Sequence, residues 1–203
     1  MGRNRRAPAG RPARIRIIGG AWRRRWLPVL GVAGLRPTAD ALRETLFNWL
    51  QPRLPGARVL DLFAGTGALG LEAASRGADS VLLVERDARA AGQLQANCET
   101  LGAEHVTVRR DDALRLLAGA PPDGLPYDLV LVDPPFGQDR VAPVLEALVA
   151  QGWLHANSRV YVEIEAAAGL DFLAAGGWQV ERERQGGQAR ALLLARAPFD
   201  TAA

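Results

Sequence analysis

The chain has 203 residues, 48% of them hydrophobic, and its 25 basic residues, all arginine, stand against 22 acidic ones. This size and composition fit one α/β domain with a small appendage. No apolar run is long enough to span a membrane, and no signal-peptide core is visible. The single cysteine, Cys98, excludes a disulfide within the chain, and two histidines are too few to suggest a zinc site. We therefore expect a cytoplasmic protein without a bound metal.

The positive charge is concentrated at the start of the chain. Residues 1–39 hold ten arginines and no acid, which leaves fifteen arginines against twenty-two acids in the rest. A basic arm on an acidic domain is typical of proteins that bind nucleic acid, although a solubilising tail or a targeting presequence has a similar composition. Trp22 and Trp26 flank Arg23, Arg24 and Arg25, and aromatic rings among arginines favour nucleic acid.

This basic region divides into a tail and a hairpin. Residues 1–12 are rich in Arg, Pro and Gly and are expected to be disordered. Residues 13–35 predict a β-hairpin arm, with strands at 14–18 and 22–29 on either side of a Gly-Gly pair. The candidate contacts of this arm to RNA phosphates are Arg14, Arg16, Arg23, Arg24 and Arg25.

Residues 36–203 predict one doubly wound α/β domain. Thr38 is placed to cap a helix that runs through Gln51 and ends at Pro52 and Pro55. Strands then alternate with helices, which is typical of βαβ units and of a mostly parallel, Rossmann-like sheet. Strands are expected near 58–62, 80–85, 105–109, 127–132 and 158–164, and helices near 67–76, 87–101, 111–119 and 139–150.

The last two expected strands, 178–184 and 190–195, are separated only by a short segment that contains two glycines. Their closeness in the chain predicts an antiparallel terminal hairpin, so one strand of the sheet should be reversed. We expect ligands to bind at the carboxyl ends of the parallel strands.

A glycine-rich turn, Asp61-Leu62-Phe63-Ala64-Gly65-Thr66-Gly67, follows the first strand of this domain. Residues 65–70 match G-x-G-x-x-G, and Glu85 lies twenty residues after Gly65, as in a dinucleotide site. Asp61 argues against that interpretation, because a carboxylate at the mouth of the turn repels a pyrophosphate. It suits a ligand that has an ammonium group and no phosphate, and S-adenosylmethionine is the candidate cofactor.

The candidate cofactor contacts follow from this choice. Asp61 is expected to meet the ammonium, directly or through water, and the turn itself approaches the methionine part through Phe63, Gly65, Thr66 and Gly67. Glu85 is placed to accept from both ribose hydroxyls, or it is a solvated acid at a strand end. Asp112 and Ala113 are placed beside the adenine amine, or Asp111 and Asp112 form an ordinary helix N-cap pair.

The candidate catalytic segment is Asp133-Pro134-Pro135-Phe136, which follows the apolar run 129–132. Each proline fixes its own φ and removes a backbone N–H, so the nearby carbonyls have no competing donors. The Asp133 carboxylate and the Pro134 carbonyl can then accept both N–H bonds of one planar amine, and Phe136 supplies a stacking face. The segment therefore predicts a grip on the exocyclic amine of a nucleobase, although a proline-rich turn alone explains the prolines equally well.

The chain resembles the class I methyltransferases that modify exocyclic amines, and among them the RsmD family. The resemblance extends from about Arg14 to Arg196. The Arg-Pro-Thr segment at 36–38 and Arg-Glu-Thr-Leu-Phe-Asn at 43–48 carry it more specifically than the glycine turn does. Further matching segments are 16–23, 132–136, 161–163 and 187–189. Relatives often have lysine in the basic arm, where this chain has only arginine, so the charge is kept.

This resemblance implies methyl transfer from S-adenosylmethionine to N2 of a guanine in 16S ribosomal RNA, the guanine(966)-N(2) reaction. It implies the assembled small ribosomal subunit as partner, and we expect a monomer. The family pattern also places Arg36 and Thr38 at the mouth of the active site, Arg36 as an RNA contact and Thr38 beside the cofactor.

Other functions remain open on the residues alone. The Asp-Pro-Pro-Phe segment suits any exocyclic amine, so adenine N6 in DNA or RNA is an alternative target. A non-catalytic RNA-binding assembly factor is another alternative, but the intact Asp61, Glu85 and Asp133 argue against it. A nicotinamide dehydrogenase is the most remote of these functions.

Overall fold

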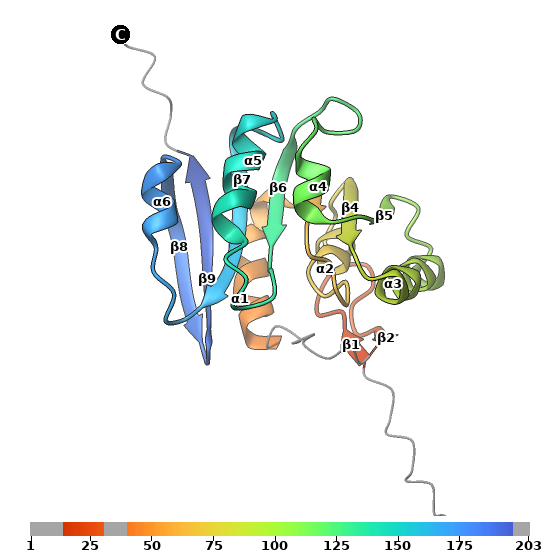
Figure 1. Cartoon of the computed structure of the whole chain (residues 1–203). Helices are drawn as coiled ribbons and strands as arrows, with labels where there is room; N and C mark the ends of the chain where they lie inside the picture. The colour runs from red at the N-terminus through yellow and green to blue at the C-terminus, as the bar shows by residue number, and fades with distance from the viewer. Residues whose placement is uncertain (1–13, 31–39, 197–203) are drawn as a thin grey trace, which may run out of the picture.

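The computed structural model describes residues 14–30 and 40–196. A seven-stranded sheet in the order β5-β4-β3-β6-β7-β9-β8 forms the centre of the molecule (Figure 1). Its strands are β3 (Arg58–Asp61), β4 (Ser80–Glu85), β5 (Val106–Arg110), β6 (Tyr127–Val132), β7 (Leu154–Glu165), β8 (Trp178–Gly186) and β9 (Ala189–Arg196). All neighbouring pairs from β5 to β7 are parallel, and β9 runs antiparallel to both β7 and β8. The predicted doubly wound sheet with one reversed strand is confirmed.

Helices cover both faces of this sheet because residues along each central strand alternate between two cores. Val59, Leu83 and Leu131 face one core, while Leu60, Val84 and Val130 face the other. The first core is covered by α1 (Asp40–Leu50), α2 (Gly70–Ser75) and α3 (Ala88–Leu101). The second is covered by α4 (Ala113–Leu117), α5 (Val141–Ala150) and α6 (Asp171–Ala175), which lie in front of the sheet in Figure 1.

Helix boundaries follow local capping chemistry. Asp87 caps α3 by accepting the backbone N–H groups of Arg89 and Ala90, and Gly102 ends this helix in the left-handed conformation at φ 65°. The α1 helix stops at Leu50, and a 3₁₀ turn over Gln51–Arg53 (η1) takes in the proline that was predicted to end the helix. The short α6 helix was not predicted. The predicted cap at Thr38 lies outside the described residues.

The predicted hairpin is present, but its strands are shorter than expected. β1 (Arg14–Arg16) pairs with β2 (Trp26–Pro28) in antiparallel register. The predicted bounds of 14–18 and 22–29 were too long. Ile17 still bonds across the hairpin to Arg24 and Arg25, but the backbone nearer the turn bonds to α2. The N–H groups of Ile18 and Gly19 donate to the Glu72 carboxylate. Those of Ala21 and Trp22 donate to the carbonyl and the hydroxyl of Ser75.

The hairpin is part of the folded body and not a free extension. Its inward side chains Ile15, Ile17 and Leu27 are buried in the same core as α1, α2 and α3. The side-chain amide of Asn97 in α3 also donates to the Pro28 carbonyl at 3.0 Å. The division of the chain into a tail of residues 1–12, an arm and a catalytic domain remains a prediction, and the tail lies outside the described residues.

Within residues 14–30 and 40–196, no helix has both the length and the apolar character needed to cross a membrane. The same residues contain no group of three or more His, Cys, Asp or Glu side chains placed to hold a metal ion.

Candidate active site

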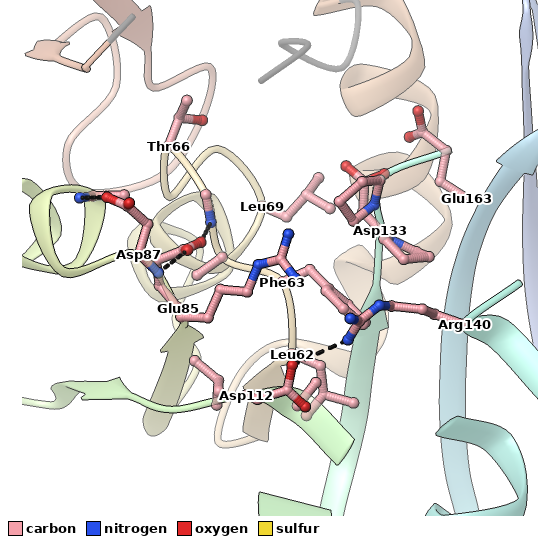
Figure 2. Close-up of a pocket in the computed structure, with 18 of the residues that line it drawn as sticks. Leu62, Phe63, Thr66, Leu69, Glu85, Asp87, Asp112, Asp133, Arg140 and Glu163 are labelled. Carbon is pink, nitrogen blue, oxygen red and sulfur yellow. Dashed lines mark hydrogen bonds and ion pairs between the residues drawn. The ribbon is translucent and has the colours of Figure 1, made fainter. Parts of the chain in front are cut away.

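A cavity of about 590 Å³ opens at the carboxyl ends of β3, β4, β5, β6 and β7 (Figure 2). Parallel α/β sheets bind ligands at this edge, where the strand order reverses direction between β3 and β6. The cavity has two ends. Glu85, Asp87 and Asp112 lie toward one end, and Asp133 and Glu163 lie toward the other.

Asp61 lies beneath the glycine turn and does not line this cavity. Its side chain is 1% exposed, and its Oδ2 accepts the backbone N–H of Gly70 at 2.9 Å. Its Oδ1 accepts the N–H of Phe63 at 3.4 Å. Burial raises the pKa of Asp61 to about 7, against the lowering effect of these two hydrogen bonds. The sequence predicted this carboxylate at the mouth of the turn, beside the ligand. In the structure it lies below the turn and holds its backbone through these two hydrogen bonds.

The turn itself approaches the cavity closely. Phe63, Gly65 and Thr66 line the cavity, while Gly67 lies behind them with φ 80° and donates its N–H to the Ala64 carbonyl at 2.6 Å. A Cβ on Gly67 would lie 2.7 Å from Leu71 and Leu94 side-chain atoms, so this position accepts only glycine without rearrangement.

Glu85 joins the end of β4 to the turn. Its Oε2 accepts the backbone N–H of Gly65 at 2.9 Å, and its Oε1 accepts the N–H of Asp87 at 2.8 Å. Glu85 therefore lies in the cavity with both oxygens oriented by backbone donors, as Figure 2 shows. This fixed position differs from that of a freely solvated acid at a strand end.

Asp112 has the capping role that was considered for it, and its contact with adenine remains a prediction. It caps α4 by accepting the N–H of Leu114 at 3.0 Å, and it lines the cavity next to Ala113. Its Oδ2 also accepts from Nη1 of Arg140 at 3.1 Å. Burial opposes ionisation, but the hydrogen bonds from Arg140 and from the α4 backbone outweigh it and lower the pKa of Asp112. Asp111 likewise lines the cavity and pairs with Arg115.

All four residues of the predicted catalytic segment line the cavity: Asp133, Pro134, Pro135 and Phe136. The segment begins directly after Val132, the last residue of β6. Val132 is in register with Val162 of β7, so Asp133 and Glu163 follow at the same level on neighbouring strands. Glu163 is 6% exposed and accepts the Tyr161 hydroxyl at 3.0 Å.

The predicted RNA contacts of the arm lie mainly on its outer surface. Arg14, Arg23, Arg24 and Arg25 are exposed, and Arg16 is half-buried with its guanidinium 5.9 Å from the centre of the Trp26 ring. Trp26 is 56% exposed, which is unusual for so large an apolar side chain. The arm also reaches the glycine turn, because Val29 and Leu30 line a small cleft together with Gly65 and Thr66. Arg36 lies outside the described residues, as Thr38 does.

The polar residues of the site that were not predicted include Glu72, Arg140 and Glu163, besides Arg86, Asp87 and Gln138 of the cavity lining. Glu163 interrupts the apolar run 160–164, and Glu72 lies among small and apolar residues in α2, so a buried acid was visible as a local anomaly. Arg140 gave no comparable signal, because an arginine at the start of a helix is ordinary.

The sheet order, with a reversed strand second from one edge and helices on both faces, is the fold of class I methyltransferases. The chain matches the solved structure of the Escherichia coli protein yhhF with a TM-score of 0.80 and 42% identity, over 91% of this chain and 98% of that one. The family model described as conserved hypothetical protein 95 matches residues 15–195.

Two relatives carry the same name. Ribosomal RNA small subunit methyltransferase D of Escherichia coli K12 is 46% identical over 174 residues, which cover 86% of each chain. The protein of that name from Haemophilus influenzae is 40% identical over 175 residues, or 85% of this chain and 89% of that one. The chain belongs to the family of ribosomal RNA small subunit methyltransferase D, as the resemblance to RsmD implied, and it is a methyltransferase.

Proposed function

We propose that the protein transfers a methyl group from S-adenosylmethionine to the exocyclic N2 of a guanine in 16S ribosomal RNA of the small ribosomal subunit. The observation that carries this proposal is the two-ended cavity. One end offers oriented carboxylates for a nucleoside, and the other offers the Asp-Pro-Pro-Phe segment for an amine. The names of the relatives support ribosomal RNA of the small subunit as the substrate.

The charge of the cavity fits S-adenosylmethionine better than a dinucleotide. Its described lining has the carboxylates of Glu85, Asp87, Asp111, Asp112, Asp133 and Glu163, against the guanidinium groups of Arg86 and Arg140. Such a surface attracts a ligand with a sulfonium and an ammonium group and repels a pyrophosphate. In calorimetry, S-adenosylhomocysteine should therefore bind and NAD should not; tighter binding of NAD would contradict this assignment.

Residues at the first end would hold the nucleoside part of the donor. Glu85 would accept from the ribose hydroxyls, and Asp112 would accept from the adenine amine; both line the cavity. The glycine turn brings the backbone near the methionine part. S-adenosylmethionine supplies an activated methyl group on a sulfonium, so the protein has to align the acceptor more than it has to activate the donor.

Residues at the second end would prepare the acceptor. The lone pair of guanine N2 is delocalised into the ring, which makes the amine a poor nucleophile. If Asp133 and the Pro134 carbonyl accept its two N–H bonds, the nitrogen gains electron density and can become pyramidal. The N2 lone pair then forms the bond to the methyl carbon while the carbon–sulfur bond breaks and its electron pair stays on sulfur. The cationic guanine loses a proton to water, and Phe136 stacks on the extruded base.

The reaction can be tested directly. Small subunits from a strain that lacks this protein are incubated with the purified protein and labelled S-adenosylmethionine, and the nucleosides are identified by mass spectrometry. N2-methylguanosine at one position of 16S RNA is the expected product. N6-methyladenosine would support the alternative target, and unlabelled RNA would contradict the proposal. Naked 16S RNA in parallel shows whether the assembled subunit is required.

A further inference from the structure

Glu163 is a buried carboxylate beside the acceptor segment to which the mechanism above gives no role. It lies one residue beyond Val162, as Asp133 lies one residue beyond Val132, and these two valines are paired in the parallel register of β6 and β7. Both acids line the same end of the cavity, and both carry a negative charge close enough to Tyr161 to raise its pKa, although burial is the larger cause.

The orientation of Glu163 is set by its neighbour on the same strand. The Tyr161 hydroxyl, itself buried, donates to Oε2 of Glu163 at 3.0 Å. A carboxylate has two oxygens and accepts several hydrogen bonds at once, so the bond from Tyr161 orients Glu163 while it lines the cavity.

We propose that Glu163 selects the target base by accepting the N1–H of guanine while Asp133 and Pro134 hold N2. This inference rests on the proposed function. In guanine, the ring nitrogen next to the exocyclic amine carries a hydrogen, and a carboxylate beside it gains a hydrogen bond. In adenine, the nitrogen next to the amine is itself an acceptor, so the same carboxylate meets a lone pair and repels it. The pair of acids on β6 and β7 thus distinguishes guanine from adenine where Asp133 alone does not.

The same contact supports the reaction. Positive charge develops on the guanine as the methyl group is transferred, and this makes N1–H a stronger donor. A fixed carboxylate at that hydrogen is therefore bound more favourably in the transition state than in the ground state. We expect Glu163 to affect kcat as well as the choice of base.

The test uses a base analogue together with a variant. Small subunits are reconstituted with 16S RNA that carries either guanine or 2-aminopurine at the methylated position. The analogue keeps the exocyclic amine at C2, but its N1 is an acceptor. The wild-type protein should methylate the analogue about tenfold to a hundredfold more slowly in kcat/KM. This comparison uses the wild-type protein alone and therefore does not depend on the folding of any variant.

The variant Glu163→Gln should reverse part of this preference, because its amide nitrogen can donate to the N1 of 2-aminopurine. Its kcat/KM on guanine subunits should fall by about tenfold or more. The ratio of kcat/KM on guanine subunits to kcat/KM on 2-aminopurine subunits should therefore decrease towards one. Glu165→Gln is the matched control, since Glu165 lies two residues further along β7 and is exposed. Its ratio should equal that of the wild type. S-adenosylhomocysteine affinity and thermal melting confirm that each variant is folded.

Two results would overturn the inference while leaving the proposed function intact. One is a wild-type protein that methylates guanine and 2-aminopurine equally well. The other is a folded Glu163→Gln protein whose preference for guanine is unchanged. A wild-type protein that methylates neither kind of subunit would overturn the proposed function, and base selection by Glu163 with it.

Discussion

The carboxylate of Glu72 accepts the backbone N–H of Gly19 at 2.7 Å, across 53 positions of the chain. Its second oxygen accepts the N–H of Ile18 at the same distance. Arg76, four residues further along at the end of α2, forms a salt bridge with Glu72. Arg43 completes the connection, because its guanidinium donates to the carbonyl of Arg16 in the arm and to that of Ala68, directly after the glycine turn. The arm and the turn are thus fixed to the same part of the domain.

Docking of the arm should fail when Gly20 is replaced by alanine. Gly20 has φ 76°, and a Cβ there would lie 1.8 Å from the carbonyl oxygen of Ser75. Gly56→Ala is the matched control, because Gly56 has φ 78° and a Cβ there meets nothing within 4 Å. We expect the control to lose about 1–2 kcal/mol of unfolding free energy from backbone strain, and Gly20→Ala to lose clearly more. Urea unfolding measures both, and equal losses would contradict the docked geometry.

The exposed arginines of the arm should govern the salt dependence of RNA binding. Replacing Arg23 and Arg25 by glutamine removes two charges without disturbing the buried side of the hairpin. The slope of log affinity against log salt concentration should decrease by roughly 1.4 to 1.8. Arg182 and Arg184, exposed on β8 at the far edge of the sheet, provide a matched double substitution that should leave the slope unchanged. Filter binding at several salt concentrations distinguishes the arm from a solubilising tail.

Binding of S-adenosylhomocysteine should release protons near neutral pH. Burial raises the pKa of Asp61 from 3.8 to about 7, so this group is partly protonated in the free protein at pH 7. Asp61 does not line the cavity, but a ligand ammonium held by the turn above it would favour the ionised form and lower its pKa. Affinity should then fall as the pH drops below about 7. Calorimetry in buffers with different ionisation enthalpies measures the protons released. Asp61→Asn should abolish the release; a wild-type protein that releases none would limit Asp61 to shaping the turn.

The raised pKa of Asp61 also affects folding, with the opposite dependence on pH. The folded protein holds this proton more tightly than the unfolded chain does, so the contribution to stability is fully present below pH 3.8. It is lost as the pH rises through about 7. Unfolding free energies measured from pH 4 to 8 should therefore decrease less steeply for Asp61→Asn than for the wild type. Parallel curves for the two proteins would show that Asp61 titrates near its ordinary value.

Removal of the Asp133 carboxylate should stop methyl transfer without weakening donor binding. Asp133→Ala loses one oriented acceptor for the N2 amine, which typically costs about a hundredfold or more in rate. Asp133→Asn keeps one acceptor oxygen without the charge, so its rate of methyl transfer should lie between those of the wild type and Asp133→Ala. Single-turnover rates on small subunits and S-adenosylhomocysteine affinities provide the comparison. Near-normal turnover of the alanine variant would exclude Asp133 from the mechanism.

The sequence predicted the sheet well because each strand is defined by its own residues. The run from Tyr127 to Val132 is apolar and bounded by turn-forming residues, and β6 occupies those positions. The helix expected over 67–76 begins later, at Gly70, because the Gly70 N–H is taken by Asp61. The five-residue α6 is too short to show a periodic pattern, and it forms where Phe172 and Leu173 pack against the core.

The site was less predictable where it depends on contacts between distant segments. Asp61 was expected at the mouth of the turn because its position in the chain does not reveal that both its oxygens face backbone donors. The hairpin was expected to pair along its whole length, but the partners of its turn are in α2, more than fifty residues away. Glu163 lies beside Asp133 only because β6 and β7 pair in this register, and the sequence alone does not show that register.

The position of β9 has a consequence for synthesis of the protein. β9 lies between β7 and β8 in the sheet, although both of these strands precede it in the chain. Until residues 189–196 have been translated, one edge of β7 has no partner strand and β8 has no strand to pair with. The sheet beside the acceptor end of the cavity, which includes Glu163 on β7, is therefore completed only after β9 has been made. Over that interval the unpaired edge of β7 is a surface on which newly made chains can associate wrongly.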